Sequence, residues 1–271
     1  MDKSKQKPWA LVTGASAGIG AEFCRQLAAQ GYQLVLVARR EDRLQNIANE
    51  LRSSHGADSL VIAADLSQKN ACQSIVKRLE DEGVDIEYLV NNAGYGLPGS
   101  FHVPEWEKHA DFIQVLMTAV CELTWRLLLG MQQRGRGFIV NVASIAGLAP
   151  SGAGHTLYGA SKAFLIRFSE CLALENKDAG VKVTALCPGF TYSEFHDVNG
   201  TREMISQLPA YLWLDARDVV ADTIEAMSGD RVKPIVVPGR QYKLMVFMSR
   251  YLPWLATILA NRTSGHFRVT D

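Results

Sequence analysis

Three side chains in the middle of the chain have the types and spacing needed to protonate a carbonyl oxygen. Tyr158 and Lys162 are four residues apart, so a helix would place them one above the other on one face. A lysine ammonium favours the phenolate and lowers a tyrosine pKa that is about 10 in model peptides, which suits general acid–base catalysis. Ser144 lies fourteen residues upstream, where a hydroxyl could hold a carbonyl oxygen. Taken alone, such a Tyr–Lys pair is more typical of a solvated helix face, so the rest of the chain must decide.

The first strand-like run, Trp9 to Val12, leads into a turn with glycines at 14, 18 and 20. A helix-period stretch follows, up to about residue 30, and then a second strand at 33–38. Glycines at such a turn let the backbone approach a pyrophosphate, and the helix N-terminus offers free N–H groups. The spacing is G-x-x-x-G-x-G rather than G-x-G-x-x-G, and a plain glycine-rich turn is the alternative. Its place between a strand and a helix favours dinucleotide binding.

The end of the second strand carries arginines where an acid would select NAD(H). Arg39 lies 19 residues after Gly20, and Arg40 follows it. A guanidinium can bind a 2′-phosphate through bidentate, charge-assisted hydrogen bonds. Glu41 and Asp42 fit the first turn of the next helix instead. We therefore expect NADP(H) rather than NAD(H), the alternative being that both arginines are merely solvated.

Strands and helices alternate along the remaining chain, which predicts a parallel sheet covered on both faces, with ligand at the carboxyl ends of the strands. Further strands are expected at 60–64, 86–90, 138–142, 181–186 and 235–237. Further helices are expected at 42–54, 68–81, 105–134, 158–179 and 215–227.

Two strand ends carry further polar candidates. Asp65 and Leu66 could meet the adenine, or Asp65 could form part of the turn with Ser67 capping the next helix. Asn91 begins the run Asn-Asn-Ala-Gly and could equally bind ligand or hydrogen-bond to neighbouring strands.

Composition limits the function classes. The 271 residues contain 28 Lys+Arg and 28 Asp+Glu, so the charge balance does not point to nucleic acid or an acidic partner. Five scattered cysteines show neither C-x-x-C nor paired histidines, which favours reduced thiols over disulfides or metal ligands. The N-terminal residues lack an apolar stretch of the secretory type. We expect a cytoplasmic protein without a metal site.

Five motifs stand in the order and spacing of the short-chain dehydrogenase/reductase family, which the chain resembles over about residues 8–240. They are Thr13-Gly14-x-x-x-Gly18-Ile19-Gly20, Asn91-Asn92-Ala93-Gly94, Ser144, Tyr158-x-x-x-Lys162 and Pro188-Gly189. The resemblance implies a single Rossmann-like domain over 1–271, a seven-stranded parallel sheet and a nicotinamide cofactor. It implies that Tyr158 is the acid/base, that Ser144 orients the carbonyl, and that Lys162 binds the nicotinamide ribose and tunes Tyr158. The run from Ala38 to Leu44 resembles that of NADP-preferring members.

The candidate cofactor-binding residues combine these motifs with the strand-end residues above. They are Gly14, Ser16, Gly18, Ile19, Gly20, Arg39, Arg40, Asp65, Leu66, Asn92, Ala93, Gly94, Tyr158, Lys162, Pro188, Gly189 and Thr191, the last expected by resemblance to touch the nicotinamide carboxamide.

The chain departs from the family at Leu116. Members commonly carry an asparagine there, which kinks the long helix and holds a water in the proton relay from the lysine to solvent. Leucine can neither bond that water nor satisfy a freed carbonyl. Either the backbone or Thr118 holds the water and turnover is slower, or the relay is broken and the protein is a cofactor-binding module. The intact Ser144, Tyr158 and Lys162 favour the first alternative.

Residues 190–214 fall between the sixth strand and the next helix, which is the place of a substrate lid. Their many aromatic and aliphatic side chains favour an apolar carbonyl compound over a sugar or a charged acid. Glu194 and His196 could bind a polar handle on the substrate.

Two apolar surfaces indicate partners. The helix that carries Tyr158 is apolar on more sides than one sheet face needs, which suggests a homodimer or homotetramer. The C-terminal extension, 241–271, is also unusually apolar, and a break at Pro253 makes it a poor membrane span. It could complete a subunit interface, cap the substrate pocket or make peripheral contact with a membrane.

We therefore expect an oxidoreductase that transfers hydride between NADP(H) and an apolar ketone, aldehyde or secondary alcohol. The alternative is a catalytically weak NADP(H)-binding regulatory or scaffold protein, motivated by Leu116. The substrate, the reaction direction and the choice between dimer and tetramer stay open.

Overall fold

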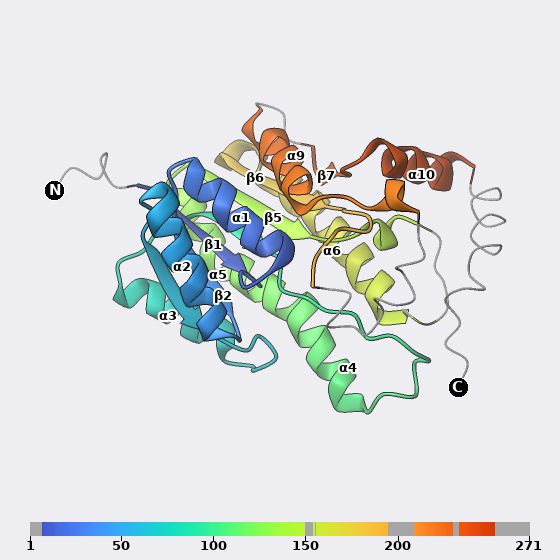
Figure 1. Ribbon diagram of the computed structural model, residues 1–271, viewed down its shortest axis with the longest axis horizontal. Coiled ribbons are helices and arrows are strands. Elements are labelled where there is room, and N and C mark those ends of the chain that lie inside the picture. The colour runs from blue at the N-terminus through green and yellow to red at the C-terminus, as the bar shows by residue number, and fades with distance from the viewer. Residues whose placement is uncertain (1–6, 150–153, 155, 195–208, 230–232, 253–271) are drawn as a thin grey trace.

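The computed structural model describes residues 7–149, 154, 156–194, 209–229 and 233–252 of the chain. Strands and helices alternate, and seven strands form one parallel sheet with the order β3-β2-β1-β4-β5-β6-β7 (Figure 1). The strands are β1 (Trp9–Thr13), β2 (Gln33–Ala38), β3 (Ser59–Ala63), β4 (Ile86–Asn91), β5 (Gly137–Val142), β6 (Val181–Leu186) and β7 (Ile235–Val236). The predicted fold class, a Rossmann-like seven-stranded sheet, is confirmed.

Helices cover both faces of the sheet, which is why its central strands are near-continuous apolar runs. The α-helices are α1 (Gly18–Ala29), α2 (Glu41–His55), α3 (Ala71–Asp81), α4 (Trp106–Ile113), α5 (Ala119–Gln133), α6 (Thr156–Glu175), α9 (Ala216–Ser228) and α10 (Arg240–Tyr251). One apolar core lies between the sheet and α1, α2 and α9, and a second lies under α3, α4 and α5, with Leu172 of α6 joining it. Short 3-10 turns are η3 (Ile145–Gly147), η4 (Lys177–Ala179) and η5 (Ala210–Leu212).

The strand order places a crevice between β1 and β4. The chain passes from β1 outward to β3, then returns to β4 on the other side of β1 and proceeds to β7. Connections therefore leave the carboxyl ends of β1 and β4 in opposite directions, and ligands bind at such a switch point. The glycine-rich turn after β1 and the Asn-Asn-Ala-Gly run after β4 both lie there.

Several predicted boundaries differ from the structure for local reasons. The helix expected at 105–134 is interrupted by a π-helical turn, η2 (Gln114–Thr118). Helix α3 begins at Ala71 rather than 68, with Asn70 at its N-cap, so the expected cap by Ser67 is wrong. Helix α6 ends at Glu175, and a 3-10 turn precedes Gly180, which has a φ of +71°. The short helix considered near 202–207 lies outside the described residues.

The continuous helical stretch Trp106–Gln133 is long and apolar enough, by length and composition, to cross a membrane. In this fold it packs on the sheet instead. Phe112, Leu116 and Leu123 are fully or almost fully buried in the second core. Such a helix is typical of the interior of an α/β domain.

Candidate active site

Helix α6 brings Tyr158 and Lys162 against the end of β5. The Lys162 ammonium donates a 2.8 Å hydrogen bond to the carbonyl oxygen of Val142, the last residue of β5. Its Nζ lies 5.5 Å from the centroid of the Tyr158 ring. The predicted side-by-side arrangement of the two side chains on one helix face is therefore present, with Lys162 buried and Tyr158 half-buried.

Ser144 is held beside this pair by the turn that follows β5. Its Oγ accepts a 3.1 Å hydrogen bond from the Ala146 amide and thereby caps η3. It also hydrogen-bonds to the side chain of Tyr158. The turn approaches α6 closely at Gly147, where a Cβ would lie 2.6 Å from the backbone carbon of Lys162. A glycine is required there because any larger residue would push the serine turn away from the helix.

The electrostatics of the pair differ from the sequence expectation. Burial raises the pKa of Tyr158 to about 12, and the hydrogen bond with Ser144 only partly opposes this. Burial also lowers the pKa of Lys162 to about 8. The expectation of a lowered tyrosine pKa is not met, because removal of the phenolate from water is the largest effect on this group. Tyr158 is a protonated phenol at neutral pH, which is the form that can donate a proton.

The glycine-rich turn lies over the carboxyl ends of β1 and β4. Gly14 and Gly18 have φ values of +65° and +55°, which side chains rarely adopt. A Cβ on Gly14 would lie 2.7 Å from Asn92 Nδ2, and one on Gly20 would lie 2.3 Å from the Gly14 carbonyl oxygen. Ile19 packs on the first core. The turn therefore presents bare backbone at a helix N-terminus, which fits the pyrophosphate of a dinucleotide.

The Asn-Asn-Ala-Gly run is bonded to that turn. Thr13 Oγ1 accepts hydrogen bonds from the amides of Asn92 (2.9 Å) and Ala93 (3.0 Å). The Asn92 side chain donates to the carbonyl oxygens of Thr13 and Gly14 at 2.9 and 3.2 Å. Gly94 follows against Leu116, whose Cγ lies 3.6 Å from a Cβ built there. The glycine turn and the Asn-Asn-Ala-Gly run, both expected at the cofactor, are thus held together by hydrogen bonds.

Asn91 belongs to the sheet rather than to the crevice. Its Nδ2 donates to Asn141 Oδ1 at 2.8 Å and to Thr124 Oγ1 at 3.2 Å, and Asn141 in turn donates to Ser169 Oγ of α6 at 2.9 Å. Of the two alternatives for Asn91, the structural one is supported. This buried series of hydrogen bonds links β4 and β5 to the helix that carries Tyr158 and Lys162.

Asp65 likewise belongs to a turn, because its carboxylate accepts a 3.0 Å hydrogen bond from the Ser67 amide. Leu66 is buried in the second core. These contacts support the turn alternative for Asp65.

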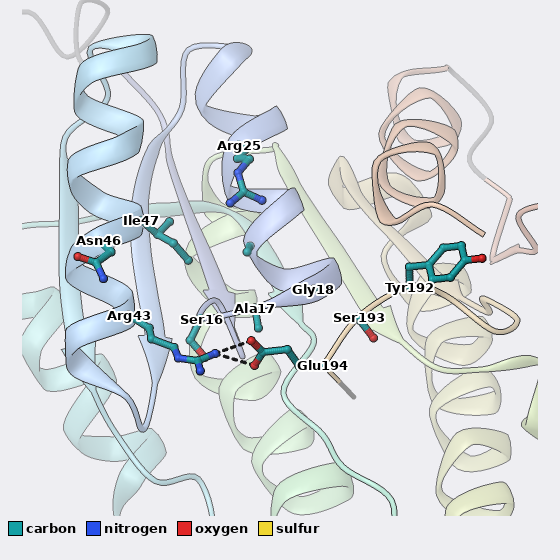
Figure 2. A pocket seen from close by; sticks show the side chains of 11 residues that line it. Ser16, Ala17, Gly18, Arg25, Arg43, Asn46, Ile47, Tyr192, Ser193 and Glu194 are labelled. Atoms are coloured by element: carbon teal, nitrogen blue, oxygen red, sulfur yellow. Dashed lines mark hydrogen bonds and ion pairs between the residues drawn. The ribbon is translucent and has the colours of Figure 1, made fainter. Parts of the chain in front are cut away.

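In the basic cluster at the end of β2, Arg40 rather than Arg39 faces the glycine turn. Arg39 is exposed, whereas Arg40 Nη2 donates to Ser16 Oγ at 3.2 Å. Arg43, on the first turn of α2, faces the same place and pairs at 2.6 Å with Glu194 from the segment after β6 (Figure 2). Ser16, Arg43 and Glu194 border a cavity of about 550 Å³ beside the first turn of α1.

The segment after β6 carries Pro188, Gly189 and Thr191. The Pro188 carbonyl oxygen accepts a hydrogen bond from the Ile145 amide at 3.1 Å, and Thr191 Oγ1 donates to the Gly189 carbonyl oxygen at 3.0 Å. Gly189 lies directly against the ring of Tyr242, so no side chain fits there. The Tyr242 hydroxyl accepts a hydrogen bond from the Phe190 amide (3.1 Å) and donates to the Leu212 carbonyl oxygen. Tyr242 thus joins the two ends of the segment expected to form the lid.

The π-helical turn η2 contains Leu116. This leucine is 1% exposed and packs in the second core, so the helix departs from α geometry here without an asparagine. Thr118 is exposed, which leaves backbone groups as the remaining candidates to hold a relay water.

We predict that Leu116→Asn raises kcat, because the amide can hold the water that resupplies protons, and leaves cofactor affinity unchanged. The free energy of unfolding should fall by about 2–4 kcal/mol, because apolar packing is lost and an amide is buried. Stopped-flow kinetics and urea unfolding measure the two effects. Leu116→Ala is the matched control, since it loses packing without supplying an amide. An unchanged kcat in Leu116→Asn would remove the relay argument.

Four residues at or around the site were not singled out for these roles from the sequence. Thr13, Gly147, Arg43 and Tyr242 act through contacts between segments distant in the chain. Thr13 and Arg43 each had a signal in the sequence, since Thr13 opens the glycine motif and Arg43 lies within the basic run after β2. Glu194 meets Arg40 and Arg43, which does not support its expected role as a handle for substrate, and His196 lies outside the described residues.

The geometry agrees with comparisons to known proteins. A family profile described as short chain dehydrogenase matches residues 8–203. The chain therefore belongs to the short-chain dehydrogenase/reductase family, whose members are oxidoreductases that bind a nicotinamide cofactor.

Two curated relatives indicate the range of the family near this chain. A very-long-chain 3-oxoacyl-CoA reductase of Anas platyrhynchos is 36% identical over 197 residues, which cover 70% of this chain and 62% of the relative. A 7beta-hydroxysteroid dehydrogenase of Collinsella aerofaciens is 31% identical over 207 residues, covering 76% and 74%. The chain spans about 57–62% of the length of the first 3-oxoacyl-CoA reductases it matches.

Solved structures extend the likeness over nearly the whole chain. One reported for 7beta-hydroxysteroid dehydrogenase stereoselectivity has a TM-score of 0.81 at 27% identity, covering 93% of this chain and 95% of that chain. A short-chain dehydrogenase from Sphingobium yanoikuyae in complex with NADPH has a TM-score of 0.79 at 29% identity, covering 97% and 98%.

Proposed function

We propose that this protein is an NADP(H)-dependent carbonyl reductase or alcohol dehydrogenase acting on an apolar ketone, aldehyde or secondary alcohol. The observation that carries the proposal is the contact of Ser144, Tyr158 and Lys162 beside a glycine turn that fits a dinucleotide. The bound cofactor supplies or accepts the hydride. The protein's own residues must then orient the carbonyl and move one proton.

Each residue of the cluster has a distinct task in this proposal. Ser144 donates a hydrogen bond to the carbonyl oxygen, and Tyr158 donates the proton that the developing alkoxide takes up. Lys162, held by the Val142 carbonyl oxygen, supplies positive charge beside the tyrosine and a donor for the cofactor ribose. Because the phenol is protonated at neutral pH, it is in the form that can donate this proton during reduction.

Preference for NADP(H) is supported by the cations around Ser16. Arg40 and Arg43 converge on one place beside the glycine turn. Two guanidinium groups and a hydroxyl match a phosphate better than a ribose hydroxyl. The remaining candidate cofactor residues, apart from Asp65 and Leu66, are proposed to line the same crevice.

An apolar substrate is supported by the described ends of the segment 190–214, which we propose as the lid of a single domain. Phe190, Tyr192 and Trp213 form an aromatic group in which Tyr192 stacks on Trp213 at 4.8 Å between ring centroids. Relatives that reduce 3-oxoacyl-CoA or act on hydroxysteroids fit this class of substrate. A panel of 3-oxoacyl thioesters, steroid ketones and bulky aryl ketones, followed by NADPH oxidation, tests the proposal. Faster turnover of sugars or charged acids would contradict it.

A second candidate function, a catalytically weak NADP(H)-binding regulatory or scaffold protein, rests on Leu116. The two functions share cofactor binding and differ in turnover, so the same panel separates them. Absence of turnover together with tight NADPH binding would favour the second.

We also propose a homo-oligomer in the cytoplasm. Exposed apolar side chains on α5 and α6 support an interface there, namely Trp125, Leu129 and Leu174. Mass photometry distinguishes monomer, dimer and tetramer.

Peripheral contact with an anionic membrane surface is supported by α10. Its exposed face mixes cations with the apolar side chains Leu244, Phe247 and Tyr251. Arg240, Lys243 and Arg250 lie on the same exposed face, and residues 231–270 contain no acid. Such a basic, aromatic face is typical of helices that lie on anionic lipid. Tyr242, on the opposite side, is buried, so the helix also belongs to the domain.

We predict that the full-length protein sediments with phosphatidylserine-containing vesicles and less with phosphatidylcholine vesicles. Lys243→Gln with Arg250→Gln should reduce the bound fraction several-fold, since each cation near such a surface contributes about 1 kcal/mol. The matched control is Lys108→Gln with Lys177→Gln, away from α10. Equal sedimentation of the α10 variant and the native protein would contradict membrane contact through this helix.

A further inference from the structure

The carboxylate of Glu194 lies in the place that the proposed function assigns to the cofactor's 2′-phosphate. Arg43 Nη1 donates to both carboxylate oxygens at 2.6 Å, and Arg40 donates to Oε2 at 3.2 Å. The same Arg40 Nη2 atom that contacts Glu194 also donates to Ser16 Oγ. Figure 2 shows Arg43 of α2 and Glu194 pointing toward one another across the start of α1.

The position of Glu194 is set by ordered backbone. Thr191 forms a parallel bridge with Leu214, and the Tyr192 amide donates to the Leu214 carbonyl oxygen at 3.0 Å. Ser193 then lies against the glycine turn, its Cβ 2.8 Å from a Cβ built on Gly18. Glu194 follows directly, so its side chain reaches the arginines from a segment that the bridge between Thr191 and Leu214 holds in place.

Glu194 is an anion at neutral pH. Hydrogen bonding from Arg43, together with the weaker contribution of Arg40, holds the pKa of its carboxyl below the usual range. A carboxylate and a phosphate present similar acceptor oxygens to a guanidinium fork. The two anions repel each other, so they cannot both occupy the donors of Arg40 and Arg43.

We propose that Glu194 is an internal competitor of the 2′-phosphate and thereby a determinant of cofactor selectivity, an inference that rests on the proposed use of NADP(H). NADP(H) must displace the carboxylate from both arginines. NAD(H) carries a hydroxyl at that position, which can donate to the carboxylate where it stands. Glu194 therefore weakens binding of NADP(H) without weakening binding of NAD(H). It reduces the preference for NADP(H) that the arginines create.

The test isolates the phosphate by comparing two fragments, adenosine 2′,5′-bisphosphate and 5′-AMP, by isothermal titration calorimetry on the full chain. Glu194→Gln should tighten the bisphosphate about three- to tenfold, because two partly exposed ion pairs no longer compete. Binding of 5′-AMP should change by less than about twofold. Glu41→Gln removes the same charge from the exposed first turn of α2, and it should change the affinity for either fragment by less than about twofold.

The outcomes separate this inference from the proposed function. Weaker bisphosphate binding by Glu194→Gln would mean that Glu194 helps to hold the bound cofactor. Equal tightening of both fragments would mean that Glu194 acts only through its general charge. Either result would contradict competition between Glu194 and the 2′-phosphate. Native preference for the bisphosphate with no change in the variant would overturn the inference and keep NADP(H). Equal binding of both fragments by the native protein and the variant would overturn NADP(H) selectivity and the competitor with it.

Discussion

Tyr158→Phe is expected to lower kcat for carbonyl reduction by about 10²–10⁴-fold, because it removes the only proton donor that the proposal places at the carbonyl oxygen. The variant should still bind NADPH, since the glycine turn and the basic cluster are untouched. The phenylalanine ring keeps the packing of the half-buried Tyr158 ring against the second core, so the fold is preserved. Single-turnover kinetics measured with NADPH and the best ketone of the panel give the effect on the chemical step.

The control for this variant is a residue of the same type outside the site. Tyr211 is 70% exposed on η5, and Tyr211→Phe should leave kcat within about twofold. Turnover by Tyr158→Phe within tenfold of the native rate would contradict the assignment of Tyr158 as acid, and Ser144 would be the next group to examine.

Lys162→Met is expected to abolish efficient turnover while making the protein more stable at neutral pH. The pKa of Lys162 falls from 10.5 in the unfolded chain to about 8 in the folded protein, so holding the ammonium costs about 3 kcal/mol at pH 7. Methionine avoids that cost, but loss of the hydrogen bond to Val142 destabilises the variant by about 1 kcal/mol. The net gain in the free energy of unfolding should be about 1–2 kcal/mol by urea denaturation.

The pH dependence follows from the same shift. Between about pH 8 and 10.5 the unfolded chain binds more protons at this lysine than the folded protein, so native stability rises with pH in that window. The advantage of Lys162→Met should therefore shrink from pH 7 toward about pH 9.5, below the range where Tyr158 ionises. Lys108→Met, at an exposed site on α4, should show no such trend. A pH-independent difference would contradict the buried ammonium.

The sheet, its strands and the meeting of Ser144, Tyr158 and Lys162 could be predicted because they depend on local pattern. Buried parallel strands are continuous apolar runs, and helix spacing alone places Tyr158 over Lys162. The glycines of the turn were readable because backbone approach at Gly14 and Gly20 excludes side chains.

Contacts between segments that are distant in the chain could not be predicted from the sequence. Arg40, at the N-cap of α2, reaches Ser16, whereas Arg39 is exposed, and the sequence does not show which of two neighbouring arginines faces the turn. Glu194 pairs with Arg43, which lies 151 residues earlier in the chain. Tyr242 hydrogen-bonds to both ends of the segment 190–214 from a helix that the sequence showed only as an apolar extension. The predicted shift in the pKa of Tyr158 had the wrong direction, because the removal of this side chain from water depends on packing by several elements.

The most direct test of the central claim is transfer of deuterium from C4-deuterated NADPH to an apolar ketone by the full-length protein, read by mass spectrometry of the alcohol. We predict one deuterium at the carbinol carbon from one cofactor epimer, and loss of product formation in Tyr158→Phe. Tight NADPH binding with no labelled alcohol from any ketone of the panel would contradict the account and favour a cofactor-binding protein without turnover.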